Sequence, residues 1–207
     1  MAYSDFTTLA KVRAAFGLTI DETRHLFKDI DPVESSSYLQ KTLAEYLPLA
    51  NAINTEKARS ELIIAPVLLE VRRICNFQIG FFSGADFTVD PEVGLSGYCD
   101  YILTASGELY EIYAPVVTLV EAKNENIKGG LGQCMAEMVA AQRFNQKQEN
   151  EVLNIYGAVT TGAIWKFLKL NDQTIFIDLN DYYIKEVNQI LGILAHPFQL
   201  QLGSNAS

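Results

Sequence analysis

Residues 115–123 read PVVTLVEAK, and this stretch decides the fold. Apart from Thr118, its first six residues are apolar, which is typical of a central strand buried on both faces of a sheet. The stretch ends on two charged residues, Glu121 and Lys123, which the two-residue period of a strand places on one face. Charges at the end of a buried strand cost free energy unless a metal, a counter-charge or a substrate compensates them. We therefore expect a functional site at this end of the strand.

An acidic residue also lies inside the strand predicted just before this one, over Gly97–Leu103. Alternation puts Asp100 on one face with Tyr98 and Ile102, where a carboxylate carries the same desolvation cost. If the two strands are neighbours, Asp100 and Glu121 can converge on a hard divalent cation, which takes oxygen ligands and keeps several waters. The structural alternative is an ion-paired strand end without chemistry.

The hydrophobic pattern on either side of these strands switches between helical and strand periods. Helices are expected over 6–16, from 19–22 onward, over 38–47, over 54–74 with a kink at Pro66, over 131–147 and over 183–194. Strands are expected over 77–82, 87–89, 97–103, 115–123, 153–159, 164–170 and 174–179, with turns at 83–84 and 171–172. The glycine-rich segment 129–132 should separate the central strand from the helix expected over 131–147. Pro48 should end or bend the second long helix, and the last helix should end before Pro197. This order predicts a mixed α/β or α+β class.

The length and composition predict one main domain with an appendage. The chain has 207 residues, 49% of them hydrophobic, which excludes global disorder and supplies a sizeable core. Segment 1–54 is predicted to be an N-terminal helical extension, 55–202 the main domain and 203–207 a loose tail. The longest apolar run, Leu62–Leu69, is far shorter than the ~20 residues that cross a bilayer, and the first residues lack a signal-peptide pattern. A cytoplasmic protein without membrane association is therefore expected.

The charge of the chain is strongly acidic but uneven. A net charge of −9 argues against a generic polyanion binder, because non-specific nucleic-acid affinity comes mainly from Lys and Arg. Residues 75–120 contain six acids and no base, whereas 56–74 and 121–148 each contain four bases and three acids. We expect these bases to include a positive rim around the site, formed by Arg59, Arg72, Arg73, Lys123, Lys128, Arg143 and Lys147. The three cysteines lack C-x-x-C spacing, so neither a disulfide framework nor a zinc cluster is predicted.

The spacing of these acids resembles that of the PD-(D/E)XK nuclease superfamily, which has the restriction-endonuclease-like fold. The pattern is a helical Glu, an Asp in a hairpin strand, Glu-x-Lys on the next strand, and a following helix that carries a Gln in some branches. In this chain these are Glu61, Asp100, Glu121-Ala122-Lys123 and Gln133, and the resemblance covers about residues 56–160. It implies an α/β core with a central mixed sheet flanked by helices.

The resemblance also implies roles for these residues. Asp100, Glu121 and the Ala122 carbonyl would ligate Mg²⁺ or Mn²⁺. Lys123 would position or activate the attacking water. Glu61 would support the metal shell, and Gln133 would orient the substrate or a metal-bound water.

Two further acids are candidates for the same site. Glu70 follows Glu61 by nine residues, half a turn away on an ideal helix, so the two face the site together only if Pro66 redirects the helix; Glu70 is the reserve for Glu61. Glu137 lies one turn after Gln133 and shares its face, so it is a candidate for supporting the metal site.

The expected function is metal-dependent phosphodiester hydrolysis of nucleic acid, with DNA favoured over RNA. The rival is a non-catalytic interaction or regulatory subunit that keeps the nuclease-like fold. The acidic charge favours the rival, and the intact Asp100, Glu121 and Lys123 favour the enzyme. A second copy of the chain or a protein partner is left open, as are sequence specificity and pathway.

Overall fold

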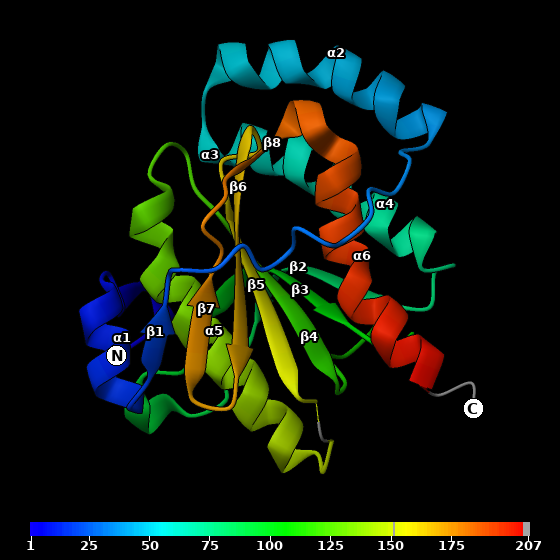
Figure 1. Ribbon diagram of the computed structural model, residues 1–207. Coiled ribbons are helices and arrows are strands. Elements are labelled where there is room, and N and C mark those ends of the chain that lie inside the picture. The colour runs from blue at the N-terminus through cyan, green and yellow to red at the C-terminus, as the bar shows by residue number, and fades with distance from the viewer. Residues whose placement is uncertain (151, 205–207) are drawn as a thin grey trace.

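An eight-stranded mixed sheet runs through the centre of the structure, a computed structural model that describes residues 1–150 and 152–204 (Figure 1). Its strands are β1 (Thr19–Asp21), β2 (Gly80–Asp86), β3 (Tyr98–Thr104), β4 (Val116–Ala122), β5 (Asn154–Thr160), β6 (Ile164–Asn171), β7 (Thr174–Ile177) and β8 (Tyr182–Tyr183). Their order is β1-β7-β6-β5-β4-β3-β2, and β8 pairs with β6. The pairs β4–β5 and β1–β7 are parallel and the others are antiparallel. The predicted mixed α/β class is confirmed.

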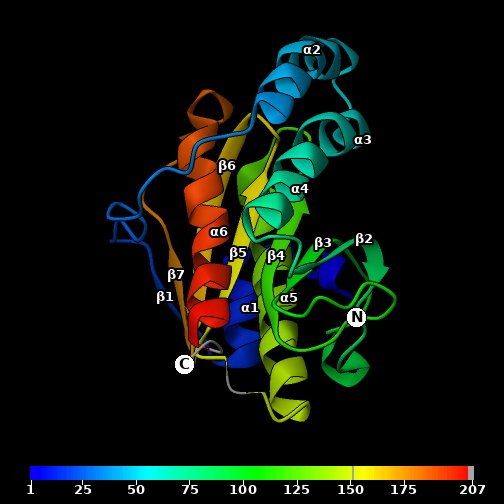
Figure 2. The same ribbon diagram turned by 90° about the vertical axis from the view of Figure 1, so that its right-hand side faces the viewer.

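Helices cover both faces of this sheet and enclose two cores (Figure 2). The helices are α1 (Leu9–Phe16), α2 (Ser37–Ile53), α3 (Glu56–Arg59), α4 (Ala65–Ile74), α5 (Ile127–Lys147) and α6 (Val187–Ser204). Short 3₁₀ turns lie at Tyr3–Asp5, Pro91–Val93 and Ile184–Glu186, and a π-helical turn lies at Ser60–Ile64. One core lies between the sheet and α5 with α1, and the other between the sheet and α4, α2 and α6. Within the described part of the chain, no helix has the length and apolar character needed to cross a bilayer.

The central strand is buried along its whole length, as its sequence predicts. Every residue of β4 is buried. Val116 and Leu119 lie on the α5 side and Val117 and Val120 on the α6 side, because the register with β3 shifts by one residue between Thr118 and Val116. Strands β3, β5, β6 and β7 also lie where they are expected. The turn expected at Asn171-Asp172 lies one residue later, at Asp172-Gln173, because Asn171 still pairs with Thr174; Asp172 has a positive φ of 51°.

The N-terminal segment differs from the helical expectation. Thr19–Glu22 does not open a helix; β1 pairs in parallel with β7 and extends the sheet. Gly17 ends α1 in the left-handed conformation, after which the β-branched Thr19 and Ile20 favour an extended chain. Segment 1–54 therefore contributes one strand to the sheet as well as α1 and α2.

Three glycine and proline positions do not interrupt their elements as expected. The run 129–132 lies inside α5, whose first turn is capped by the Asn126 side chain, an acceptor for the Gly129 N–H. A methyl group at Gly132 would collide with the Phe6 carbonyl, so this glycine permits close packing of the N-terminal segment. Pro48 does not end α2, which continues to Ile53, and Pro197 lies within α6, where continuation of the helix buries Phe198.

Three other boundaries also differ from expectation. Strand β2 continues through Ser83 and Gly84, because Gly84 supplies a positive φ of 59° while pairing with β3 resumes at Ala85. The helix expected over 54–74 comprises α3, the π-helical turn and α4, and the irregular turn lies just before Pro66, which lacks an N–H. Of the expected loose tail, 203–204 belong to α6 and 205–207 lie outside the described residues.

Candidate functional site

The pairing of β3 with β4 brings Asp100 and Glu121 together on one face. Tyr101 pairs with Val120 and Ile102 with Leu119, so the next pair in this register joins Asp100 to Glu121. The face is that of Ile102 and Leu119, which lie in the core beneath α5. The Ala122 N–H donates to Asp100 Oδ2 at 2.8 Å and fixes this carboxylate. The predicted convergence of the two acids is therefore present.

Lys123 lies on the same face at the end of β4. Its ammonium forms an ion pair with Glu121 Oε1, and its backbone N–H donates to the Thr160 carbonyl of β5 at 2.8 Å. Its side chain passes over Gly130 in the first turns of α5, where a methyl group would lie about 3.0 Å from it. Burial disfavours the ammonium, but the Glu121 carboxylate favours it more and raises the pKa of Lys123. Lys123 is thus a fixed, charged donor.

Helix α5 adds a second buried carboxyl to the site. Glu137 is completely buried, and its Oε1 accepts from Gln133 Nε2 at 3.1 Å. Glu121 is only 1% exposed. When both groups are ionised, their second oxygens, Glu121 Oε2 and Glu137 Oε2, are buried without a hydrogen-bond partner; a proton on either carboxyl allows the two groups to hydrogen-bond each other. Such a pair of carboxyls is stable only if a proton or a cation offsets their charge.

The ionisation of both carboxyls is perturbed in the direction that this crowding requires. Burial, followed by repulsion from Asp100, raises the pKa of Glu121 to about 8, although Lys123 opposes the shift. Burial and repulsion from Glu121 raise the pKa of Glu137 well above its usual value. In the absence of a cation, the two groups therefore hold protons at pH values where exposed carboxyls are ionised.

The two helical acids proposed by the sequence pattern lie elsewhere. Glu61 has a 60% exposed side chain and pairs with Lys57 at 2.8 Å. The neighbouring Ser60 bonds the Tyr101 hydroxyl at 2.6 Å on the opposite face of β3, so the structure does not bring Glu61 against Glu121. Glu70 is buried and accepts the Ser36 N–H at 2.8 Å at the start of α2. It serves helix packing.

One buried polar residue next to the site in sequence was missed by sequence reasoning. Asn124 follows Lys123 directly, and its Oδ1 is buried without a hydrogen-bond partner. An asparagine after a strand is typical of a turn, so no sequence signal distinguished it.

The end of β4 offers few oxygen donors to a cation. Among the described residues, no group of three or more His, Cys, Asp or Glu side chains is arranged to hold a metal. Mg²⁺ is usually bound through one or two carboxylates and keeps several waters. Asp100 and Glu121, with the Ala122 carbonyl between Glu121 and Lys123, match that sparse donor set, and the unpartnered Glu121 Oε2 is the oxygen that such an ion would satisfy.

The predicted positive rim is wrong for four of its seven members. Arg72 donates to the Ile79 carbonyl beside the start of β2, and Arg73 pairs with Glu70 on the same helix. The start of β2 pairs with the end of β3, and the end of β3 pairs with the start of β4. Arg72 and Arg73 therefore lie at the end of the sheet opposite to Glu121. Arg143 pairs with Asp90, and Lys147 bonds the Val89 carbonyl, near Asn145, which bonds Val116 at the start of β4. Arg59, Lys123 and Lys128 remain at the end of β4 where Glu121 lies.

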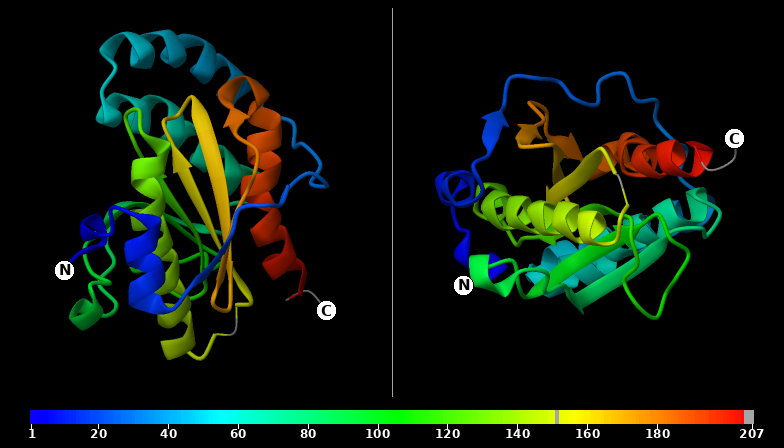
Figure 3. Two further views of the ribbon diagram at one scale, coloured as in Figure 1. Left: turned by 60° about the vertical axis from the view of Figure 1, so that its left-hand side comes forward. Right: turned by 90° about the horizontal axis from the view of Figure 1, so that it is seen from below.

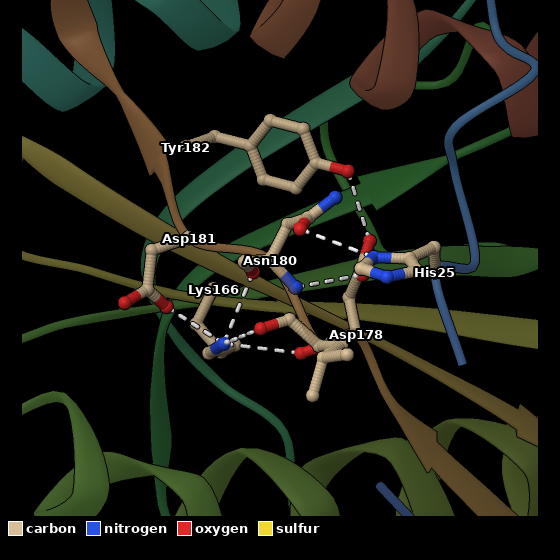
Figure 4. Close-up of polar contacts among 7 residues, drawn as sticks. His25, Lys166, Asp178, Asn180, Asp181 and Tyr182 are labelled. Carbon is tan, nitrogen blue, oxygen red and sulfur yellow. Dashed lines mark hydrogen bonds and ion pairs between the residues drawn. The ribbon is translucent and has the colours of Figure 1, made fainter. Parts of the chain in front are cut away.

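A second buried polar cluster lies beyond the end of β7 (Figure 4). Asp178 is 2% exposed; its Oδ1 accepts the Asn180 N–H at 3.0 Å and its Oδ2 accepts the Tyr182 hydroxyl at 2.9 Å. Lys166 donates to three backbone carbonyls, at residues 178, 179 and 180, and pairs with Asp181 at 2.6 Å. Each Asp178 oxygen has a partner, so this cluster is explained by structure alone.

The site at the end of β4 thus contains four of the five predicted side chains, Asp100, Glu121, Lys123 and Gln133, together with Glu137. No family model matches this chain, and no curated protein is significantly similar to it.

Proposed function

We propose that the chain is a metal-dependent phosphodiesterase that hydrolyses nucleic acid and has a restriction-endonuclease-like core. One observation carries the proposal: Glu121 and Glu137 each leave a buried oxygen without a partner, beside Asp100 and Lys123 at the end of the central strand. Without a cation, these oxygens are satisfied only by a proton that the two carboxyls share, so the pair can take up either a proton or a metal ion.

The residues divide the work by their chemistry. Asp100, Glu121 and the Ala122 carbonyl would hold Mg²⁺ or Mn²⁺, which when bound would polarise the phosphate and lower the pKa of a water. Lys123 is an ammonium that cannot ligate a cation but can orient a water or a phosphate oxygen. Gln133 holds Glu137, and Glu137 lies against Glu121, so α5 fixes the orientation of the carboxylate that would bind the ion.

Hydrolysis tests the proposal directly. Labelled double-stranded DNA, single-stranded DNA and RNA are incubated with Mg²⁺, Mn²⁺ or a chelator, and DNA is the substrate we expect to be cut. Asp100→Asn and Lys123→Ala should each lower the rate by at least ~10²-fold, the usual effect of removing a catalytic group. Matched controls are Asp90→Asn and Lys147→Ala, which remove the same charges at the start of β4.

Metal titration separates the roles of the two residues. Isothermal titration with Mn²⁺ should show that Asp100→Ala loses affinity, whereas Lys123→Ala binds nearly as wild type does. If Lys123→Ala keeps its fold but loses as much affinity as Asp100→Ala, the division of roles is wrong.

The rival function is a non-catalytic subunit that acts through a protein partner or a second copy of the chain. It is favoured by the net charge of −9 and by the placement of Arg72, Arg73, Arg143 and Lys147 away from the site. Metal binding by a folded protein that cuts none of the three substrates would select this rival.

A further inference from the structure

Arg59 differs from the other arginines whose contacts the structure defines. Its Nη1 donates to the Thr161 carbonyl at 3.1 Å and its Nη2 to Asn54 Oδ1 at 2.9 Å, so both acceptors are neutral. Among the described residues, no carboxylate forms an ion pair with it. Its Nε is buried and has no acceptor. Arg59 is therefore a half-buried cation with an unused donor.

Four other arginines have partners that differ from those of Arg59. Arg24, Arg73 and Arg143 each pair with a carboxylate, and Arg72 uses its Nε to bond the Ile79 carbonyl at 3.0 Å. Leaving a buried donor unsatisfied is destabilising, and more so for a charged group. An arginine with no anionic partner in the protein is suited to an anion from outside, because each Nη atom carries a second N–H and guanidinium donors bind phosphate oxygens in a fixed fork.

Arg59 also lies next to the candidate site. Its acceptor Thr161 follows Thr160, whose carbonyl accepts the backbone N–H of Lys123 at 2.8 Å. Glu56, one turn before Arg59 in α3, is close enough to raise the pKa of Lys123. Figures 1 and 3 both show α3 beside the loop that joins β4 to α5.

The other charges at the site indicate a role for Arg59 in binding an anion. The ammonium of Lys123 is already paired with Glu121, and Asp100 adds a further acid. A phosphodiester that approaches this end of β4 needs a cation that no carboxylate neutralises. Among the described ion pairs, neither Arg59 nor Lys128 at this end has a carboxylate partner. Arg59 differs from Lys128 in that two hydrogen bonds hold it between α3 and the loop after β5.

We propose that Arg59 binds a non-bridging phosphate oxygen of the substrate backbone, beside the phosphate that is hydrolysed. The inference rests on the proposed nuclease function and adds a substrate-binding residue to it. The ligand is the phosphodiester backbone, so the contact does not depend on base sequence.

Binding without hydrolysis is the first test. Fluorescence anisotropy with a labelled DNA oligonucleotide is measured in Ca²⁺ for wild type, Arg59→Ala, Arg59→Lys and Arg72→Ala. Arg72→Ala is the matched control, because it removes the same charge from an arginine that bonds a backbone carbonyl at the other end of the sheet. Arg59→Ala should weaken affinity about tenfold or more and reduce the salt slope by about 1. Arg59→Lys should keep the slope and lose part of the affinity. Equal affinity and slope for Arg59→Ala and Arg72→Ala would overturn the proposal.

A measurement on the unchanged chain covers the case in which Arg59→Ala does not fold. In a ¹⁵N-arginine spectrum, the Nε–Hε signal that is absent from Arg59→Lys should shift when the oligonucleotide is added. The Arg72 signal, assigned through its own variant, should not shift. An Arg59 signal that stays in place while the oligonucleotide binds contradicts the proposal.

The outcomes separate this inference from the proposed function. If Arg59→Ala leaves DNA cleavage in Mg²⁺ unchanged, the proposed Arg59 contact is wrong and the proposed nuclease function stands. If DNA binding depends on Arg59 but no cleavage occurs in Mg²⁺ or Mn²⁺, the proposed nuclease function is wrong and the Arg59 contact stands. Absence of both binding and cleavage removes both.

Discussion

Asp178 and Glu121 lie at the same end of the sheet and are almost equally buried, yet their surroundings differ. Strands β4 and β7 run in the same direction; Glu121 lies near the end of one, and Asp178 follows the end of the other. Both Asp178 oxygens accept hydrogen bonds. Glu121 Oε2 and the adjoining Glu137 Oε2 accept none.

The two lysines repeat this difference. Lys166 has three carbonyl acceptors and one carboxylate, so its hydrogen-bonding capacity is filled within the protein (Figure 4). Lys123 has one carboxylate partner for its ammonium. Burial alone therefore does not identify a functional carboxylate; the unfilled capacity for hydrogen bonds and charge does.

The largest expected effect is a difference in stability between two isosteric substitutions. Asp178→Asn places an amide NH₂ against either the Asn180 N–H or the Tyr182 hydroxyl, and the donor left unpaired should lower the free energy of unfolding by about 1–3 kcal/mol. Glu137→Gln keeps an oxygen that can accept from Gln133 and removes one of two crowded ionisable groups, so in chelator it should leave that free energy unchanged or raise it. Urea unfolding at pH 7 measures both. Equal destabilisation by the two variants would remove the contrast between the clusters.

The next effect is the dependence of stability on pH in chelator. Because the pKa values of Glu121 and Glu137 are raised in the folded state, these groups bind protons there that the unfolded chain releases above its ordinary carboxyl pKa. The free energy of unfolding should fall between about pH 4.5 and 8, by at most about 1.4 kcal/mol per pH unit for each group. The loss from Glu121 should level off above its folded pKa of about 8.

Glu121→Gln and Glu137→Gln are the matched variants for this pH series. Each should flatten the fall in stability. A wild-type curve that rises between pH 5 and 8 would show that the two carboxyls are ionised in the metal-free protein.

The strands around the site could be predicted because local patterns determine them. The apolar run over Val116–Ala122 predicts a central buried strand. The two-residue period of each strand predicts which neighbours share a face with Asp100 and with Glu121, but it does not predict that the two strands pair. Contacts between residues far apart in the chain could not be predicted from local patterns. β1 is a strand because it pairs with β7, which lies more than 150 residues away, and no local hydrophobic period predicts that pairing.

The helical acids show why site residues are harder to predict than strands. Glu61 and Glu70 are equivalent in sequence terms, as acids among apolar residues. Their positions follow from the π-helical turn at Ser60–Ile64 and from the start of α2 at Ser36, which takes Glu70 as its acceptor. Likewise, Arg59 and Arg72 look alike in the sequence, and only their acceptors distinguish them.

The smallest effect concerns Gln133 and tests whether α5 supports the site through a single hydrogen bond. Gln133→Leu removes the donor to Glu137 Oε1, which leaves Glu137 with both oxygens short of donors; the expected loss of stability is about 1 kcal/mol. The matched variant is Gln142→Leu, which removes one amide donor from the same helix, where it bonds the Asp172 carbonyl at 2.9 Å. If the bond positions Glu137 against Glu121, Gln133→Leu should also lower kcat about three- to tenfold with little change in KM, whereas Gln142→Leu should leave kcat unchanged. The two variants should differ in kcat more than in stability, because only Gln133 belongs to the cluster with unfilled oxygens. Equal kcat values would place Gln133 with Lys166 and Asp178, among the polar side chains that hold the fold together.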